Sequence, residues 1–171
     1  LIAGRNEEKV IGNLIESIAN QNYDKSLISV FVVADNCTDN TALVAKQAIE
    51  KSQFGGWGIF ERFNKELVGK GYALDFLLDK IKTSKEIDET KIDAFLVFDA
   101  DNLLDENFIY ETNKVLDAGY DISTSYRNSK NFNTNTISAN SGMIFLRECR
   151  FMHTPRAILN SSTFISGTGF M

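Results

Sequence analysis

The stretch that most constrains the fold is residues 94–102, AFLVFDADN, where a short apolar run ends in two carboxylates one residue apart. A run rich in Phe and Val is typical of a strand buried on both faces, as in a parallel sheet covered by helices. Such sheets bind ligands at the carboxyl ends of their strands. Asp99 and Asp101 are therefore predicted at that edge, where their repulsion favours a divalent cation between them. Asp101 and Asn102 also suit an ordinary turn, and Asp105 could begin the next helix.

Strand and helix patterns alternate along the rest of the chain. This alternation predicts an α/β fold, a Rossmann-like and mostly parallel sheet flanked by helices, with right-handed crossovers. Thr38 or Asp39 is expected to cap the second helix. Residues 52–58 and 82–91 are expected to be loops. Strands are expected at 1–3, 28–33, 59–63, 94–99, 122–126 and 163–165, and helices at 7–18, 38–49, 73–81, 105–116 and 142–152. Pro155 is expected to break the last of these helices or to start another short one.

Composition indicates one soluble domain covering 1–171. The chain has 171 residues, of which 43% are hydrophobic and 24% charged, as in ordinary globular proteins. The net charge of −5 argues against a general nucleic-acid or anionic-membrane surface. No apolar stretch approaches the roughly 18 residues of a membrane span. Because Leu1 falls inside a strand pattern, we expect an excised and C-terminally truncated piece of a longer protein.

The cysteines and the histidine do not form a metal-binding pattern. Cys37 and Cys149 are far apart and have no nearby histidine at ligand spacing, which argues against a zinc site. We interpret them as free thiols, in keeping with a reducing compartment. His153 is the only histidine and is expected to be a surface side chain.

Polar side chains follow three predicted strands. Asn6 and Glu7 follow the first, Asp35 follows the second, and Asp99 and Asp101 follow the fourth. Side by side, these strand ends would line one crevice. This recurrence favours a binding site over unrelated turn residues.

Together these stretches resemble the nucleotide-binding half of a family 2 glycosyltransferase with the GT-A fold, over essentially the whole chain. Four segments carry the resemblance, and the closest similarity is to the cellulose-synthase-like, often membrane-anchored branch. They are IAGRNE at 2–7, with Ala3 in place of the usual proline, VADNCTDNT at 33–41, VGKGYAL at 68–74, and FDAD at 98–101.

The resemblance implies a metal-dependent, inverting transfer of a hexose from a UDP-sugar to a saccharide or lipid acceptor. Asp35 would accept a hydrogen bond from uracil, while Ala3, Asn6 and Glu7 would hold the uridine. Lys70 would approach the uridine or diphosphate, and Asp99 would face the ribose. Asp101, with Asp99, would bind Mg²⁺ or Mn²⁺.

The acceptor side and the catalytic base are also expectations from the resemblance. Ser166, Gly167, Thr168 and Gly169 resemble the loop beside the acceptor. Family members place the base after this loop, and no Asp or Glu follows Glu148 here. We therefore expect the base beyond Met171, and expect this piece to bind donor without turnover. The parent is expected to be an integral membrane protein with this domain on the cytoplasmic face.

A basic segment and two rival functions remain open. Arg127, Arg147 and Arg150 lie among Phe and Met, and could contact the acceptor, a membrane or only solvent. An aspartate-based, Mg²⁺-dependent phosphotransferase is an alternative, although Leu103 stands where that class has Thr or Val. A non-catalytic nucleotide-sugar-binding module is another. A sugar-nucleotide pyrophosphorylase would need a longer first loop than Gly4–Asn6.

Overall fold

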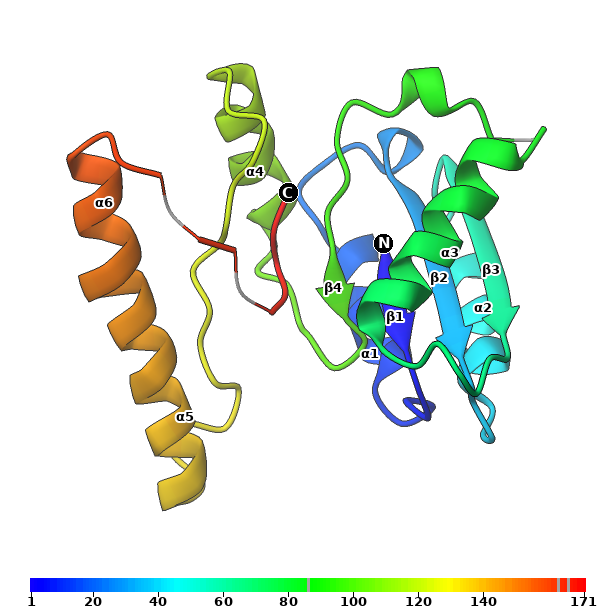
Figure 1. Cartoon of the computed structure of the whole chain (residues 1–171), viewed down its shortest axis with the longest axis horizontal. Helices are drawn as coiled ribbons and strands as arrows, with labels where there is room; N and C mark the ends of the chain where they lie inside the picture. The colour runs from blue at the N-terminus through cyan, green and yellow to red at the C-terminus, as the bar shows by residue number, and fades with distance from the viewer. Residues whose placement is uncertain (86, 163, 166) are drawn as a thin grey trace. The chain divides into compact units, whose positions relative to one another are not determined.

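The computed structural model describes residues 1–85, 87–162, 164–165 and 167–171 (Figure 1). These residues form two compact units: unit 1 is Leu1–Asp121 with Met171, and unit 2 is Ile122–Phe170. Within the described ranges, none of the helices combines the length and apolar character needed to cross a bilayer. The elements of unit 1 are β1 (Ile2–Gly4), α1 (Ile11–Ala19), η1 (Lys25–Leu27), β2 (Ser29–Asp35), α2 (Thr41–Glu50), β3 (Gly56–Arg62), α3 (Lys70–Thr83), η2 (Glu89–Lys91), β4 (Phe98–Asp99) and α4 (Phe108–Asp117).

The described strands of unit 1 form one parallel sheet in the order β3-β2-β1-β4. The predicted α/β class with a parallel sheet is therefore confirmed. β1 lies in the middle, where Ala3 is in register with Val33 of β2 and with Asp99 of β4. Since all four strands run the same way, their carboxyl ends meet at one edge.

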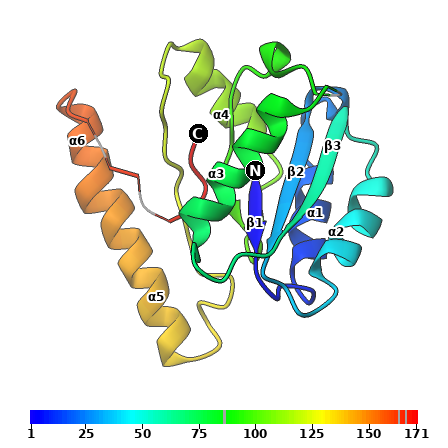
Figure 2. The ribbon, with the colours of Figure 1, turned by 45° about the vertical axis from the view of Figure 1, so that its right-hand side comes forward.

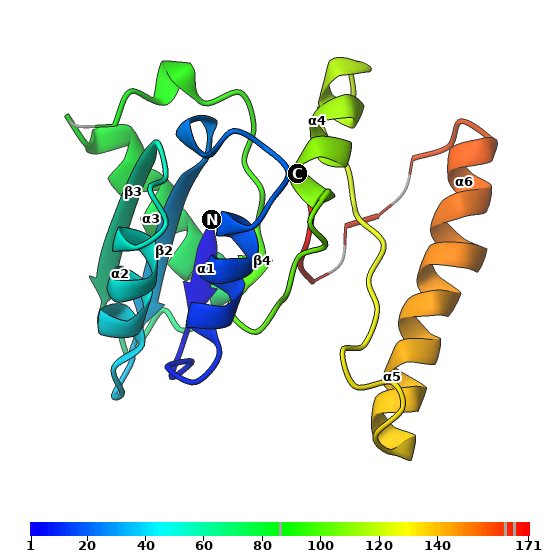
Figure 3. The ribbon, with the colours of Figure 1, turned by 180° about the vertical axis from the view of Figure 1, so that it is seen from behind.

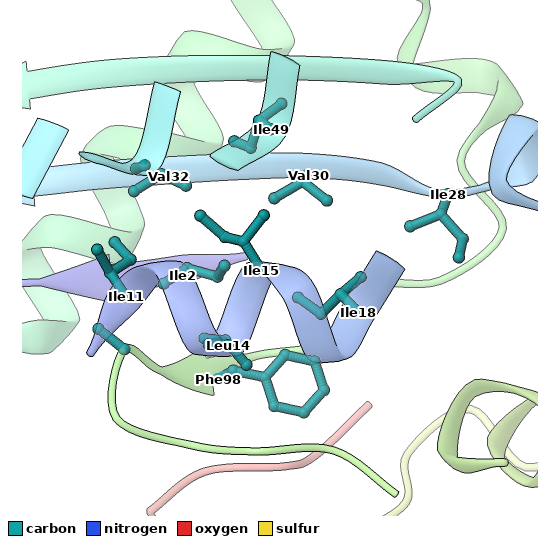
Figure 4. Packing of buried hydrophobic residues seen from close by; sticks show 12 residues of the cluster. Ile2, Ile11, Leu14, Ile15, Ile18, Ile28, Val30, Val32, Ile49 and Phe98 are labelled. Atoms are coloured by element: carbon teal, nitrogen blue, oxygen red, sulfur yellow. The ribbon is translucent and has the colours of Figure 1, made fainter. Parts of the chain in front are cut away.

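Helices cover both faces of this sheet, because successive strand residues point to opposite sides. On one face, α1 and α2 bury Leu14, Ile15 and Ile49 against Ile2 and other residues of the strands (Figure 4). On the other face, α3 packs Leu77 and its neighbours against the inward-facing residues of β2. Figure 2 shows α3 on the near side of the sheet. Figure 3 shows the molecule from behind, with α1 and α2 on the opposite face of the sheet. The result is a three-layer arrangement of helices, sheet and helix.

Gln21, for which no role is predicted from the sequence, positions α4. Its side chain is buried, and its amide NH₂ donates to the carbonyl oxygens of Ser17 and Asp105, at 3.1 and 2.6 Å. Its Oε1 atom accepts from the N–H of Ile109 at 2.9 Å, which satisfies a donor in the first turn of α4. Phe108 then packs edge-on against Phe98, with ring centroids 5.4 Å apart.

Several predicted boundaries in unit 1 were wrong by a few residues. α1 begins at Ile11 rather than at Glu7, because residues 7–10 form turns. Asn40 rather than Thr38 or Asp39 is the N-cap of α2, although the Asp39 carboxylate accepts from the N–H of Thr41 at 3.0 Å. β3 is longer than expected and includes Gly56–Gly58, whereas β4 is only Phe98–Asp99. A two-residue β4 is enough to fix the position of the acidic motif, which consists of Asp99 and Asp101.

Unit 2 is mainly helical. Its elements are α5 (Thr136–Arg147), the π-helical η3 (Glu148–His153) and α6 (Thr154–Ile158). The helix predicted at 142–152 begins earlier than expected, and the prediction that Pro155 could start another short helix is confirmed. Pro155 lies at the start of α6, where its missing N–H is tolerated. The strand predicted at 122–126 was wrong, since only Thr124 makes a bridge, to Phe170. The strand predicted at 163–165 includes Thr163, which lies outside the described residues.

Candidate functional site

A cavity of about 170 Å³ lies at the carboxyl ends of the strands of unit 1. Of the residues predicted to bind nucleotide, Ala3, Asp35, Lys70 and Asp99 line it, whereas Asn6 and Glu7 are not part of its lining. Residues from β1, β2, β4 and the start of α3 therefore meet at the predicted edge. The complete lining is Ala3, Gly4, Arg5, Asp35, Val68, Gly69, Lys70, Ala73 and Asp99.

Asp35 forms a buried ion pair with Arg62. The two residues are opposite each other in the parallel register of β2 and β3, and Nη1 of Arg62 lies 2.6 Å from Oδ1 of Asp35. Their side chains are only 7% and 8% exposed. The other guanidinium nitrogen, Nη2, donates to the carbonyl oxygen of Leu67 at 2.7 Å. Arg62 thus connects Asp35 to the loop that leads into Lys70.

Asn36 donates to the same carboxylate oxygen of Asp35 as Arg62 does. Its backbone is left-handed, with φ of 51°, a conformation that Asn adopts more readily than most residues. Its amide donates to Oδ1 of Asp35 and to the carbonyl oxygen of Asn64, at 3.1 and 3.0 Å. Oδ2 of Asp35 accepts no hydrogen bond from the described residues, so it can receive a donor from a ligand.

Lys70 and Asp99 form the second ion pair of the cavity. Nζ of Lys70 lies 2.5 Å from Oδ1 of Asp99, and the side chains are 33% and 41% exposed. Lys70 is the first residue of α3, following Gly69, whose φ of 137° is accessible mainly to glycine. This placement brings an ammonium group to the predicted diphosphate position, beside the first carboxylate of the acidic motif.

The loop after β1 is joined to the loop after β2 by hydrogen bonds. The side chains of Asn6 and Thr41 accept from the N–H groups of Thr38 and Glu7, both at 2.8 Å. Asp39 accepts from the N–H of Glu8 at 3.1 Å, and Glu8 accepts from that of Asn40 at 3.0 Å. These bonds make one rigid rim from two loops, and they engage the side chain of Asn6 within the protein.

Several carboxylates gather beside this rim. Burial raises the pKa of Glu7 above its ordinary value, and the negative charges of Asp101, Asp39 and Asp99 raise it further. Burial would also raise the pKa of Asp39, but hydrogen bonds from the Thr41 hydroxyl and from the N–H groups of Glu8 and Thr41 lower it overall. The acidic motif therefore lies in a field that attracts cations.

The donor set fits a magnesium or manganese ion only if the substrate completes it. Among the described residues there is no group of three or more His, Cys, Asp or Glu arranged to hold a metal. Mg²⁺ is commonly bound by one or two carboxylates together with substrate phosphates and water. Asp101 and Asp99 can supply such a partial set of oxygen ligands.

The crowding of carboxylates predicts a pH-dependent gain in stability for Glu7→Gln. Because the folded pKa of Glu7 lies above the unfolded one, its contribution to stability falls as pH rises through that interval. Glutamine removes this loss, so we expect Tm to rise at pH 7 and not to rise below about pH 4, near the ordinary pKa of a glutamate. Thermal unfolding followed by circular dichroism measures both values. The same exchange at the exposed Glu16 is the control, and an equal gain at both pH values would contradict the explanation.

Some predicted residues lie elsewhere, and some site residues were not predicted. Gly167, Thr168 and Gly169 belong to unit 2, where the carbonyl of Gly169 accepts from the N–H and hydroxyl of Ser125. Ser166 of the same predicted loop lies outside the described residues.

Arg5 and Arg62 were not predicted as site residues: Arg5 lines the cavity, and Arg62 acts on it through its ion pair with Asp35. Cys37 packs in the rim, accepting from the N–H of Asn6 at 3.4 Å.

A second cavity of unit 1, of about 180 Å³, lies at the opposite end of the strands. Leu1 of the first strand, Ser29 of β2 and Leu96 before β4 line it. The charged side chains in its lining are those of Lys91 and Asp93. Because parallel sheets bind ligands at their carboxyl ends, we assign the candidate site to the first cavity.

Comparison with known proteins gives a consistent family and fold. The model of Glycosyl transferase family 2 matches residues 1–171. No curated protein sequence matches the chain significantly. The structure of S. aureus TarS 1-349 in complex with UDP is similar at a TM-score of 0.58 and 18% identity, covering 80% of this chain and 37% of that one. Mannosyltransferase PcManGT from Pyrobaculum calidifontis in complex with GDP-Man and Mn2+ is similar at a TM-score of 0.59 and 20% identity, covering 77% and 35%.

These similarities extend over a limited part of the neighbours. The chain spans little more than a third of the length of the solved structures that it matches. At these identities the structural likeness shows the fold, which is the GT-A fold of those glycosyltransferases.

Proposed function

The chain belongs to glycosyl transferase family 2, and from this premise we propose that the cavity at the carboxyl edge binds the nucleoside diphosphate of a UDP-sugar. The observation that carries the proposal is the convergence of Asp35, Lys70 and Asp99 on one cavity. A carboxylate, an ammonium group and an acidic motif match the three parts of such a donor: base, diphosphate and metal. The placement of the parent in the cellulose-synthase-like branch remains a prediction.

We assign Asp35 to the uracil base. Its Oδ2 atom can accept the base N–H in a charge-assisted hydrogen bond, while Arg62 and Asn36 hold Oδ1. Asn6 is part of the rim through its bond to Thr38. Its proposed role is therefore to shape the uridine site rather than to contact the uridine directly.

The diphosphate is assigned to the side of the cavity formed by Lys70 and Asp99, the first carboxylate of the acidic motif. As the bond to the sugar breaks, the departing UDP gains negative charge, which the Lys70 ammonium group stabilises without a proton donor. When bound, a divalent ion held by Asp101 and Asp99 would supply further charge stabilisation to the diphosphate. Phosphate binding would also give Lys70 a further anionic partner besides Asp99.

The proposed reaction is an inverting displacement. A hydroxyl of a saccharide or lipid-linked acceptor attacks the anomeric carbon on the side opposite the departing UDP, and a general base takes its proton. We assign that base to no residue of 1–171, and we assign Gly167, Thr168 and Gly169 to the acceptor side. We therefore propose that this chain alone binds donor and transfers no sugar.

Isothermal titration of UDP into the chain tests the proposal. We expect binding that strengthens at least about tenfold when Mn²⁺ is present, because the ion would join the diphosphate to the carboxylates. UDP should bind more tightly than GDP if Asp35 and the rim fit the smaller base. Absence of binding with and without Mn²⁺ would contradict the nucleotide site, and tighter binding of GDP would contradict only the assignment of the base.

A further inference from the structure

The β3–α3 loop, residues 63–69, forms part of the cavity at the carboxyl edge of the sheet. It runs along that edge from the end of β3 to the start of α3 (Figure 1). Val68 and Gly69 line the cavity, and Lys70 follows them directly. Every residue of the loop except Asn64 is exposed, so burial of apolar side chains contributes little to its order. The contacts that constrain the path of the loop are hydrogen bonds.

Arg62 connects Asp35 to this loop directly. Its Nη1 atom donates to Oδ1 of Asp35 at 2.6 Å, and its Nη2 atom donates to the carbonyl oxygen of Leu67 at 2.7 Å. A guanidinium group holds its nitrogens in a rigid, planar fork, so the two acceptors are kept at a set separation. Because Arg62 is buried, its side chain has little freedom to exchange these partners for water.

Asn36 and Asn64 make a second connection between the same two residues. The Asn36 amide donates to Oδ1 of Asp35 at 3.1 Å and to the carbonyl oxygen of Asn64 at 3.0 Å. Its Oδ1 atom accepts from the N–H of Asn64 at 2.9 Å. Oδ1 of Asn64 in turn accepts from the N–H groups of Glu66 and Leu67, both at 2.9 Å. Both connections therefore start at Asp35 and end at Leu67.

We propose that Arg62 and Asn64 are positioning residues, which hold the diphosphate ligand Lys70 in place relative to the base ligand Asp35. Lys70 and Asp35 have these roles in the proposed function, on which this inference rests. Leu67 is bound through both its N–H and its carbonyl oxygen, three residues before Lys70. A loop that is already ordered in this way can bind the two parts of one nucleotide without a further loss of conformational entropy.

A purely structural role for these residues predicts a different result. If they only stabilised the fold, their loss would affect the binding of uridine and of pyrophosphate alike, or would affect neither. Positioning predicts a selective loss, because pyrophosphate reaches the Lys70 side of the cavity and uridine reaches Asp35. The ratio of the two affinities therefore distinguishes the two roles.

Titration calorimetry of Asn64→Ala with uridine, pyrophosphate and UDP tests the proposal, with Mn²⁺ present for the two phosphate ligands. The substitution removes Oδ1 and leaves the main-chain bonds between Asn64 and Asn36 in place. We expect the affinities for pyrophosphate and UDP to fall about tenfold, because binding must then order the loop. The affinity for uridine should be unchanged. Amide hydrogen exchange should become faster in residues 66–69.

Three further variants make the experiment specific. Asn64→Asp keeps an oxygen for the two N–H groups of the loop and should recover most of the lost affinity. Arg62→Lys keeps a cation beside Asp35 but has one nitrogen in place of the fork, so it should show the same selective loss. Asn22→Ala removes an exposed side-chain hydrogen bond outside the cavity lining and should change none of the three affinities. Far-ultraviolet circular dichroism verifies that each variant folds.

Two outcomes would overturn the inference alone. One is an unchanged affinity of Asn64→Ala for pyrophosphate, and the other is an equal loss for uridine and pyrophosphate. In both cases UDP binding by the unsubstituted chain would leave the proposed function in place. If the unsubstituted chain binds no UDP with or without Mn²⁺, the proposed function fails and this inference fails with it.

Discussion

Replacement of Arg62 by methionine is expected to lower the free energy of unfolding by about 3–5 kcal/mol. The reason is that methionine leaves the Asp35 carboxylate buried without its cation, at a position where the pair is almost fully removed from solvent. The hydrogen bond from Arg62 to the carbonyl oxygen of Leu67 is lost as well. Denaturant unfolding of both proteins measures the difference.

Two controls make the Arg62 experiment specific. Lys46→Met breaks the exposed pair with Glu50 and should cost less than about 1 kcal/mol. The double variant Asp35→Asn with Arg62→Met removes both charges, and it should recover most of the stability because no unpaired ion remains. A single variant that loses less than about 1 kcal/mol would mean that water reaches Asp35 and that the pair is not effectively buried.

Replacement of Asp101 by asparagine should abolish the dependence of UDP binding on Mn²⁺. Asparagine keeps the size of the side chain but removes the charge that would hold the ion, so affinity in the presence of Mn²⁺ should fall by at least about tenfold, to its value without the ion. Affinity without the ion should change little, or rise slightly, because the carboxylate repels the diphosphate. Titration calorimetry with and without Mn²⁺ measures both values.

Asp79→Asn is the matched control for this prediction, since Asp79 is an exposed residue of α3 outside the cavity. It should leave both affinities unchanged. An Asp101→Asn protein that retains the full response to Mn²⁺ would show that the ion is held without Asp101. That result would contradict the metal assignment while leaving the nucleotide site in place.

The parallel sheet and its edge could be predicted because the signals are local. Apolar runs such as 28–33 and 94–99 are short, rich in β-branched or aromatic residues, and followed by polar residues. The resulting positions of Asp35 and Asp99 at strand ends agree with the structure. Helix starts were less accurate, as Glu7 shows, because hydrogen bonds between loops rather than helix propensity determine where α1 begins.

The missing parts of the prediction depend on contacts between distant residues. Arg62 pairs with Asp35 only because β2 and β3 are adjacent and in that register, which a single sequence does not reveal. Gln21 reads as a loop residue, yet it connects Ser17 to the start of α4. Residues 122–126 alternate as a strand would, but only Thr124 finds a partner. In each case the contacts of the residue in the folded chain determined its role, and the local sequence pattern does not contain those contacts.

The bonds between the first two loops have a consequence for substitutions in either loop. Since Asn6, Glu8, Asp39 and Thr41 accept from N–H groups of the opposite loop, a change in one loop removes a partner that the other needs. Substitution of any of these four acceptors should therefore destabilise the opposite loop as well as its own, because it leaves a main-chain N–H of that loop without its partner. Grafting a donor specificity from a relative should likewise succeed only when residues 5–8 and 36–41 are transplanted as one block.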